Sequence, residues 1–150
     1  MELRRGSVRD TKELYDLIDR NREHLTNLVW VKSATLQSTW EFLDGVECAL
    51  ETFRLIVVNG KIAGCITLRH GNECDIIGYW LGHEYRGDGI MKEAVAQMIR
   101  HWPRAIRAQI REANSASMAI LEGAGFMYMG KFLKDDEYWV DLVLYPIYNK

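Results

Sequence analysis

Residues 77–91 combine an apolar strand pattern with a glycine-containing turn that suits a phosphate-bearing ligand. The turn reads Arg86-Gly87-Asp88-Gly89 and leads into a predicted helix. Glycine lets a backbone approach a ligand closely because no Cβ intervenes. The first amides of a helix lack intrahelical partners and lie at its positive end. These properties predict pyrophosphate binding, although an ordinary strand-to-helix turn has the same composition.

A second polar segment follows a later predicted strand. Asn114 and Ser117 stand at the start of a predicted helix that ends before Gly125. Taken alone, both residues suit helix capping or a turn. Two nucleotide-binding motifs are excluded, because the chain has neither the Gly-x-Gly-x-x-Gly spacing nor the Gly-Lys-Ser/Thr of a P-loop.

Hydrophobic patterns along the chain predict the elements that position these segments. Leu14, Leu17 and Ile18 recur at helical spacing after Asp10, which suits a helix N-cap. Asn59-Gly60 between two β-branched runs predicts a two-residue hairpin, since both turn positions need positive φ. The predicted strands cover residues 3–5, 53–58, 61–68, 75–82, 105–110, 127–133 and 137–145. One predicted helix begins at residue 10, and three more cover residues 38–51, 88–102 and 115–124. This order predicts an α+β (mixed α/β) fold and excludes a doubly wound Rossmann sheet.

Two of the predicted helices have apolar residues that mark their inner faces. Pro103, which cannot continue a helix, marks the end of the helix over 88–102. The expected inward residues are Trp40, Phe42, Leu43 and Leu50 in the helix over 38–51, and Met91, Val95, Met98 and Ile99 in the helix over 88–102.

Length and composition fit a single domain over residues 1–150. The chain is 48% hydrophobic and 27% charged, values typical of a domain with its own core. Its net charge of −2 argues against a nucleic-acid-binding protein, which needs a basic excess. Cys48, Cys65 and Cys74 match no zinc or redox spacing and are expected in the core of a protein from a reducing compartment. With neither a signal peptide nor an apolar run of the ~20 residues that span a membrane, a cytoplasmic location is expected.

Taken together, the two polar segments resemble the GNAT acetyltransferases, in particular the RimL-type branch, which acetylates protein N-termini including those of ribosomal proteins. The family pattern Arg/Gln-x-x-Gly-x-Gly/Ala corresponds to Arg86, Gly89 and Met91, and methionine is usual in the RimL-type form, Gly-Ile-Met-x-Glu-Ala. The later pattern Asn-x-x-Ser, with its Gly-Phe ending, corresponds to Asn114 and Ser117. Residues 77–81, 19–25 and 30–31 also resemble this branch, so the resemblance covers nearly the whole chain.

The resemblance implies a GNAT fold and acetyl-CoA as co-substrate. The implied fold is a central, mostly antiparallel twisted sheet of six to seven strands, splayed at strands 4 and 5 and flanked by about four helices. Amides of residues 87–91 would hold the pyrophosphate, while Asn114 and the free edge of the fourth strand would hold the pantetheine arm. The implied donor-binding residues are Trp80, Leu81, Gly82, Arg86, Gly87, Asp88, Gly89, Ile90, Met91, Asn114 and Ser117.

The resemblance also implies most of the catalytic groups. Strand amides near Trp80 and Leu81 would form the oxyanion site. Many relatives protonate the leaving thiolate with a tyrosine, and because Leu121 stands at that position here, the role passes to Ser117 or to water. Many relatives carry a glutamate base where this chain has Ile76. The base is therefore open, with acidic candidates that equally suit a solvated surface at Asp75, Asp135, Asp136, Glu137 and Asp141.

The expected acceptor is an amine, and free energies of deprotonation favour an α-amine. Deprotonation at pH 7 costs about 1 kcal/mol for an α-amine but about 5 kcal/mol for a lysine side chain. A site without a strong base therefore suits the N-terminus of a protein or peptide. Asn21, His24 and Trp30 are the expected acceptor-side residues, although His24 also fits helix packing and Trp30 a core anchor.

Two other functions stay open at this point. A small amine, such as a polyamine, an amino acid or an aminoglycoside, is an alternative acceptor. A non-catalytic acyl-CoA-binding module is the other reading, because Leu121 and Ile76 stand where relatives often carry catalytic groups. The histidines show no metal-ligand spacing, so no metal is expected. The short turn at residues 135–137 would expose a strand edge that the second subunit of a homodimer could cover.

Overall fold

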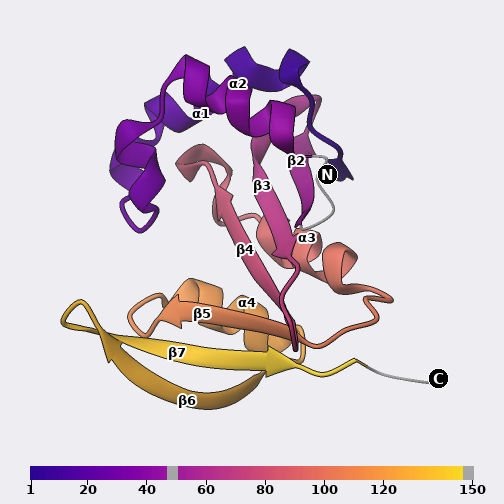
Figure 1. Cartoon of the computed structure of the whole chain (residues 1–150), viewed down its shortest axis with the longest axis vertical. Helices are drawn as coiled ribbons and strands as arrows, with labels where there is room; N and C mark the ends of the chain where they lie inside the picture. The colour runs from indigo at the N-terminus through magenta and orange to yellow at the C-terminus, as the bar shows by residue number, and fades with distance from the viewer. Residues whose placement is uncertain (47–50, 147–150) are drawn as a thin grey trace.

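A computed structural model describes residues 1–46 and 51–146, and its strands form one seven-stranded sheet in the order β1-β2-β3-β4-β5-β7-β6 (Figure 1). Neighbouring strands are antiparallel except for β4 and β5, which are parallel. The strands are β1 (Glu2–Arg4), β2 (Glu51–Val58), β3 (Lys61–Arg69), β4 (Asp75–Leu81), β5 (Ile106–Arg111), β6 (Met127–Lys134) and β7 (Glu137–Leu144). Each begins and ends within two residues of its prediction.

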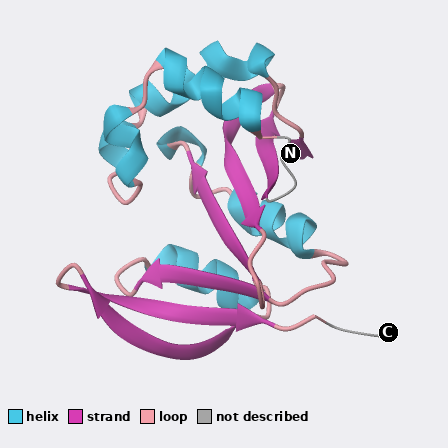
Figure 2. Ribbon diagram, in the orientation of Figure 1, coloured by secondary structure: helices cyan, strands magenta, loops and turns pink. Residues whose placement is uncertain are grey.

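In the part of the chain that the structure describes, four α-helices cover the two faces of the sheet (Figure 2). They are α1 (Thr11–Arg20), α2 (Leu36–Gly45), α3 (Ile90–Ile99) and α4 (Ser115–Gly123). One buried cluster packs α1 and α2 on the sheet through residues such as Leu17, Leu43 and Leu55, and a second packs α3 and α4 on the opposite face through residues such as Val95 and Leu121. Leu55 and Ile56 are both fully buried but belong to different clusters, because successive residues of a strand point to opposite faces.

The parallel contact between β4 and β5 is confined to two residue pairs. Asp75 pairs with Ile106, and Ile76 pairs with Arg107, after which the two strands diverge (Figure 1). The predicted splay between the fourth and fifth strands is therefore confirmed.

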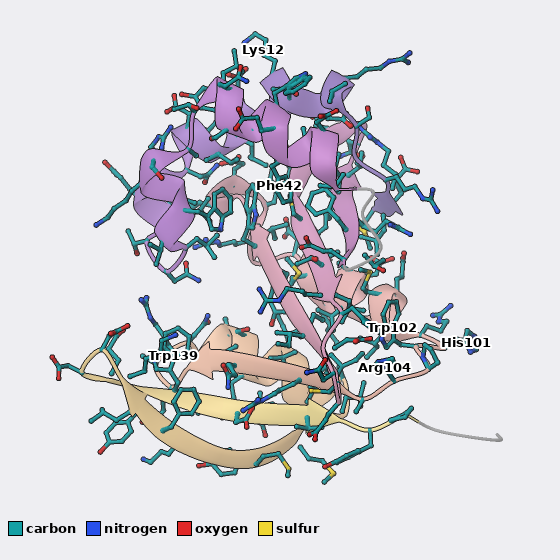
Figure 3. The ribbon with its side chains drawn as sticks, viewed as in Figure 1. Lys12, Phe42, His101, Trp102, Arg104 and Trp139 are labelled. Carbon is teal, nitrogen blue, oxygen red and sulfur yellow. The ribbon has the colours of Figure 1, made fainter. Side chains whose placement is uncertain are left out.

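Asp75 lies at the point from which β4 and β5 diverge, which we call the vertex of the splay. Its side chain is only 1% exposed and accepts hydrogen bonds from the indole N–H of Trp102 at 2.9 Å and from Nε of Arg104 at 3.1 Å. The backbone amide of Gly71 donates to it at 3.2 Å, and Nδ1 of His70 lies 3.1 Å away. Figure 3 shows Trp102 and Arg104 beside the point where β4 and β5 meet. A buried carboxylate is stable here because its oxygens are satisfied on several sides.

The predicted hairpin at Asn59-Gly60 is confirmed. Both residues have positive φ, 51° and 76°, as a type I′ turn requires. The helix predicted to begin at Asp10 is also present, but the Asp10 carboxylate does not cap it. That carboxylate instead closes a capping box with Ser7 one turn earlier and pairs with Arg4 at 2.8 Å, which fastens β1 to the start of α1.

The helix predicted over residues 38–51 is wrong at both ends. Helix α2 begins at Leu36, where Thr35 and Ser38 form a capping box, and it ends at Gly45. Glu51, predicted as its last residue, begins β2 instead, while Cys48 and Leu50 lie outside the described residues. Trp40 and Phe42, predicted to face the core, are 42% and 44% exposed.

Two smaller corrections follow from local backbone geometry. Helix α3 begins at Ile90 rather than at residue 88, because Gly89 stands at its N-cap in the left-handed conformation. It ends at Ile99 rather than at residue 102, and His101 has a φ of 61°, which helical backbone does not allow. Cys65 is buried as predicted, whereas Cys74 is half-buried in the loop before β4.

Candidate active site

The turn between β4 and α3 provides a place for an anionic group. Gly87 and Gly89 have φ of 92° and 73°, a region that other residues rarely adopt. The two glycines flank Asp88 and turn the chain so that α3 starts with free amides. Because α3 has no side-chain cap, its first turn is available to a phosphate oxygen.

Arg86, which precedes this turn, fixes the loop to the N-terminal region. Its Nε donates to the carbonyl oxygen of Leu81 at 3.3 Å, and its Nη2 donates to the carbonyl oxygen of His24 at 2.9 Å. Gly82 is packed tightly beneath α1, since a Cβ at that position would lie 2.9 Å from Leu17. These two residues position the turn, and Arg86 also lines the cleft described next.

A cleft of about 680 Å³ occupies the gap between β4 and β5. It contains nine of the residues predicted to bind the acyl donor, namely Trp80, Leu81, Arg86, Gly87, Gly89, Ile90, Met91, Asn114 and Ser117. Gly82 and Asp88 do not line it. We call this space the donor cleft.

The β4 edge that faces the donor cleft has backbone amides that β5 does not pair. Gly82 donates its amide to Ala63 on the β3 side, whereas the amide of Asp75 donates to Ala105 on the β5 side. In an antiparallel pair, alternate residues direct their backbone groups to the same neighbour. The amides of Tyr79 and Leu81 therefore face the donor cleft, and that of Trp80 faces β3. Of the two amides predicted for the oxyanion site, only that of Leu81 has this direction.

Ser117 and Asn114 stand together at the start of α4 on the opposite wall. The Asn114 side chain accepts a hydrogen bond from the Ser117 amide at 3.2 Å, so it caps the helix, as its sequence position alone suggested. The Ser117 hydroxyl lies 2.5 Å from the hydroxyl of Tyr79 on β4. Burial raises the pKa of Tyr79 above its ordinary value of 10.0, and the hydrogen bond to Ser117 opposes this only in part. Tyr79 therefore carries its proton at neutral pH.

Trp139 supports the assignment of the cleft to a polar ligand. It lies on β7 beside the gap between β4 and β5 (Figure 3) and lines the donor cleft. Its indole N–H is buried and has no acceptor among the described residues. A buried donor without a partner is costly unless a ligand or water satisfies it. The two left-handed glycines and the unpaired β4 amides together fit a long polar molecule that ends in phosphates.

A second pocket of about 430 Å³ lies on the other face of the sheet, beneath α1 and α2. Its lining includes Trp30, Phe42, Phe53 and Trp80 among mostly apolar residues. Phe42 lies below α2 on the side of the sheet (Figure 3), with its ring centre 5.1 Å from that of Phe53. We call this space the apolar pocket. Both spaces share the lining residues Leu28, Gly78, Tyr79 and Trp80, so they meet at the middle of β4.

The three predicted acceptor-side residues have different positions. Trp30 lines the apolar pocket, is 46% exposed and packs edge-on against Trp80 at a ring-centre distance of 6.3 Å. His24 lines the donor cleft and stacks on His83 at 3.9 Å. Asn21 is 1% exposed and lines neither space; its amide group binds the backbone of Leu17 and His83. Asn21 thus fastens α1 to the chain that follows β4.

The acidic residues considered as bases lie away from both spaces. Asp75 is committed to the vertex of the splay, as described above. Asp141 forms a bidentate pair with Arg107 at 2.7 and 2.9 Å, and Glu137 pairs with Arg111 at 3.1 Å. The remaining two, Asp135 and Asp136, form the exposed turn between β6 and β7 with positive φ.

Three residues that line these spaces were missed from the sequence. Tyr79 and Gly78 lie in a strand whose resemblance to the RimL-type branch was recognised, but neither side-chain position was given a role, and Glu51 in the apolar pocket was predicted at the end of a helix. The signal for Tyr79 and Gly78 was their position two and three residues before the end of β4, at the site of the predicted splay.

Neither a metal centre nor a membrane-spanning helix is found in the part of the chain that the structure describes. Residues 1–46 and 51–146 contain no group of three or more His, Cys, Asp or Glu side chains placed to hold a metal ion. Over the same ranges, every helix is too short or too polar to cross a bilayer.

A splayed sheet with a cleft at the splay and a second pocket that meets it at the same strand is the arrangement that the resemblance to the GNAT acetyltransferases implies. Residues 1–127 match the family model described as the acetyltransferase (GNAT) domain. The chain therefore belongs to the GNAT acetyltransferase family, and it is an acetyl-CoA-dependent N-acetyltransferase.

Solved structures with the same fold include three with coenzyme A or acetyl-CoA. The ribosomal L7/L12 alpha-N-protein acetyltransferase RimL in complex with coenzyme A aligns with a TM-score of 0.88 at 20% identity, over 95% of this chain and 92% of that one. The microcin C7 self-immunity acetyltransferase MccE, in complex with acetyl-CoA and AMP, aligns with a TM-score of 0.87 at 21% identity, over 96% of this chain and 91% of that one. RimJ of Mycobacterium smegmatis, in complex with CoA-disulfide, aligns with a TM-score of 0.83 at 21% identity, over 95% of this chain and 80% of that one. A search of curated proteins finds no match.

Proposed function

We propose that this acetyltransferase modifies the N-terminal α-amine of a protein or peptide by direct transfer in a ternary complex. The observation that supports direct transfer between the two substrates is that the donor cleft and the apolar pocket meet at residues 78–80 of β4. Two bound substrates would meet there without a covalent enzyme intermediate. The choice of an α-amine is supported by the structural similarity to RimL, an alpha-N-protein acetyltransferase of ribosomal L7/L12.

The donor cleft has residues for the pyrophosphate and the pantetheine arm of acetyl-CoA, which supplies the activated acetyl group as a thioester. The amides of Gly87, Gly89 and the first turn of α3 bind the pyrophosphate. The free amide of Tyr79 donates to the pantetheine arm, and the amide nitrogen of Asn114, whose oxygen caps α4, binds it from the opposite wall.

The reaction then needs three actions from the protein. The acceptor ammonium gives one proton to water and becomes a neutral amine, and its nitrogen forms a bond to the acetyl carbon as the carbon–sulfur bond breaks. The Leu81 amide stabilises negative charge on the carbonyl oxygen. Ser117 donates its hydroxyl proton to the leaving sulfur, and the second amine proton returns through water to the Ser117–Tyr79 pair. Tyr79, bonded to the Ser117 hydroxyl at 2.5 Å, orients that group and can restore its proton.

A small amine is the second candidate acceptor. The apolar pocket, at about 430 Å³, falls within the range of roughly 300–1,000 Å³ typical of small-molecule sites. A peptide acceptor needs the pocket only for its first residue, whereas a small amine is bound by the pocket alone.

Thiol release from acetyl-CoA tests the choice between these acceptors. The purified protein is incubated with a peptide that has a free N-terminus and no lysine, with the same peptide N-acetylated, and with an N-acetylated peptide that contains lysine. Thiol release with the first peptide alone, reduced in Ser117→Ala, supports the proposal. Equal release with the blocked lysine peptide contradicts α-amine preference, and release with small amines only favours the second candidate.

A further inference from the structure

The apolar pocket contains a carboxylate that has no cationic partner among the residues that the structure describes. Among the described residues that line it, Glu51 is the only acidic one and none is basic. The carboxylate accepts a hydrogen bond from the Thr67 hydroxyl at 2.7 Å, and no lysine, arginine or histidine nitrogen of the described residues lies within 4.0 Å of it. A charge beside apolar walls is costly unless an opposite charge or several hydrogen bonds satisfy it. The pocket thus favours a cationic ligand group.

Strand register places this carboxylate near the junction of the two spaces. Thr67, the hydrogen-bond partner of Glu51, lies directly opposite Gly78 in the pairing of β3 with β4. Adjacent strands are about 4.8 Å apart, so only one strand spacing separates the Thr67 backbone from the junction. Gly78 presents no side chain to block the way. A ligand amine bound to Glu51 is therefore close to the part of β4 that both spaces share.

The walls of the pocket suit an apolar group attached to that amine. Trp30, Phe42 and Trp80 provide aromatic surface, and Trp30 and Phe42 are 46% and 44% exposed. Large exposed apolar residues that line one pocket mark a binding surface. The aromatic rings offer flat faces and edges to a ring or a branched side chain.

We propose that the apolar pocket binds acceptors in which a large apolar or aromatic group stands next to the amine, and that Glu51 binds the ammonium group of that acceptor. The proposal rests on the proposed function, since it names the acceptor class of the same site. For a peptide, the first residue would be phenylalanine, leucine or methionine. A related structure is described as modifying an N-terminal serine, and serine would leave these walls in contact with water.

Binding of three small amides without acetyl-CoA tests both halves of the proposal. Phenylalanine amide has the ring and the amine, 3-phenylpropionamide has the ring without the amine, and glycine amide has the amine without the ring. Trp30 and Trp80 line the pocket, so tryptophan fluorescence reports binding, and calorimetry checks it. Phenylalanine amide is expected to bind at least tenfold more tightly than either other amide. A hydrogen bond to a charged group and the burial of a ring each contribute enough binding free energy for a tenfold change in affinity.

Glu51→Gln keeps the shape of the side chain and its hydrogen bond to Thr67 but removes the charge. This substitution is expected to weaken the binding of phenylalanine amide at least tenfold and to leave the binding of 3-phenylpropionamide unchanged. Glu73→Gln, which removes an exposed acid from the loop before β4, is the matched control and should change neither. Equal binding of phenylalanine amide to wild type and Glu51→Gln overturns the role of Glu51. Equal binding of glycine amide and phenylalanine amide overturns the role of the walls.

Failure of this proposal is distinct from failure of the proposed function. Thiol release with a free-N-terminus peptide that does not depend on Glu51 would sustain acetyl transfer and overturn the acceptor class. Selective, Glu51-dependent binding of the amides without thiol release from acetyl-CoA in the presence of any peptide would support the proposed specificity of the pocket. It would contradict a peptide as the acceptor.

Discussion

The hydroxyl groups of Tyr79 and Ser117 lie 2.5 Å apart and connect β4 to the start of α4 across the donor cleft. Ser117 is 6% exposed and its backbone is fixed by the Asn114 cap, so the hydroxyl has a defined position. The hydrogen bond joins the two walls that diverge from the Asp75 vertex. It is also the contact through which a β4 residue would influence the proposed proton donor.

Ser117→Ala is expected to lower kcat by on the order of 10²-fold, the usual contribution of a positioned acid. Tyr79→Phe is expected to lower it about fivefold, since one hydrogen bond contributes about 1 kcal/mol. Because Tyr79 acts through Ser117, Tyr79→Phe should have no further effect in the Ser117→Ala background, as steady-state rates of the double mutant would show. Additive losses would mean that Tyr79 acts independently.

The protonation state of Tyr79 has its own measurable consequence. Burial of the phenol raises its pKa above 10.0, so it is neutral and able to donate throughout the physiological range. In an ultraviolet titration, the difference between wild type and Tyr79→Phe should therefore develop only above pH 10. Tyrosinate absorbance from this residue below pH 9 would contradict the buried, protonated state.

Gly89→Ala is expected to weaken coenzyme A binding and to cost about 1–2 kcal/mol of stability, because alanine is strained at a φ of 73°. The penalty is conformational, since an added Cβ at this position would have no atom within 4 Å. Gly123→Ala, at the last position of α4 and equally free of neighbours, is the matched control. It should leave binding unchanged and preserve or raise the melting temperature. Unchanged coenzyme A affinity in Gly89→Ala would argue against the pyrophosphate site.

Gly78→Ala tests the junction between the two spaces. Its Cβ would lie 3.5 Å from a methyl carbon of Thr67, an ordinary contact, so the fold should tolerate it. Because Gly78 lines both spaces, the methyl group is expected to separate the substrates and lower kcat at least tenfold with near-wild-type coenzyme A affinity. Thermal melting and calorimetry would distinguish this result from unfolding. Wild-type turnover would place the transfer point elsewhere.

Asp75→Asn is expected to destabilise the protein by about 3 kcal/mol, because it leaves buried donors around a weaker acceptor. The expected result is a lower midpoint in urea unfolding, accompanied by weaker coenzyme A binding as the vertex loosens. Asp44→Asn, at an exposed position on α2, is the control and should stay within about 0.5 kcal/mol of wild type. A loss no larger than that of the control would mean that the vertex does not depend on the Asp75 charge.

Features governed by neighbouring residues could be predicted from the sequence. The Asn59-Gly60 hairpin depends on two φ angles, the turn at residues 86–89 on two glycines, and the start of α4 on one cap. Each signal lies within a few residues of the feature that it determines. The family resemblance added the splay between β4 and β5, which local patterns do not show.

Contacts between distant segments could not be predicted in this way. Glu51 reaches the apolar pocket only because β2 pairs with β3 in a particular register, and residues 38–51 as a sequence also suit one continuous helix. Asp75 appears as an ordinary polar residue until Trp102 and Arg104 surround it. The role of Tyr79 likewise depends on α4 folding back across the cleft.

The two-pair ladder between β4 and β5 leaves the sheet as two blocks, β1–β4 and β5-β7-β6, joined at one corner. A bound pantetheine arm would act as a removable strand that spans the gap. The amide protons of Tyr79 and Leu81 should then exchange rapidly with deuterium in the free protein and slowly in the complex. Donor binding would thus complete a β-sheet that the polypeptide alone leaves open.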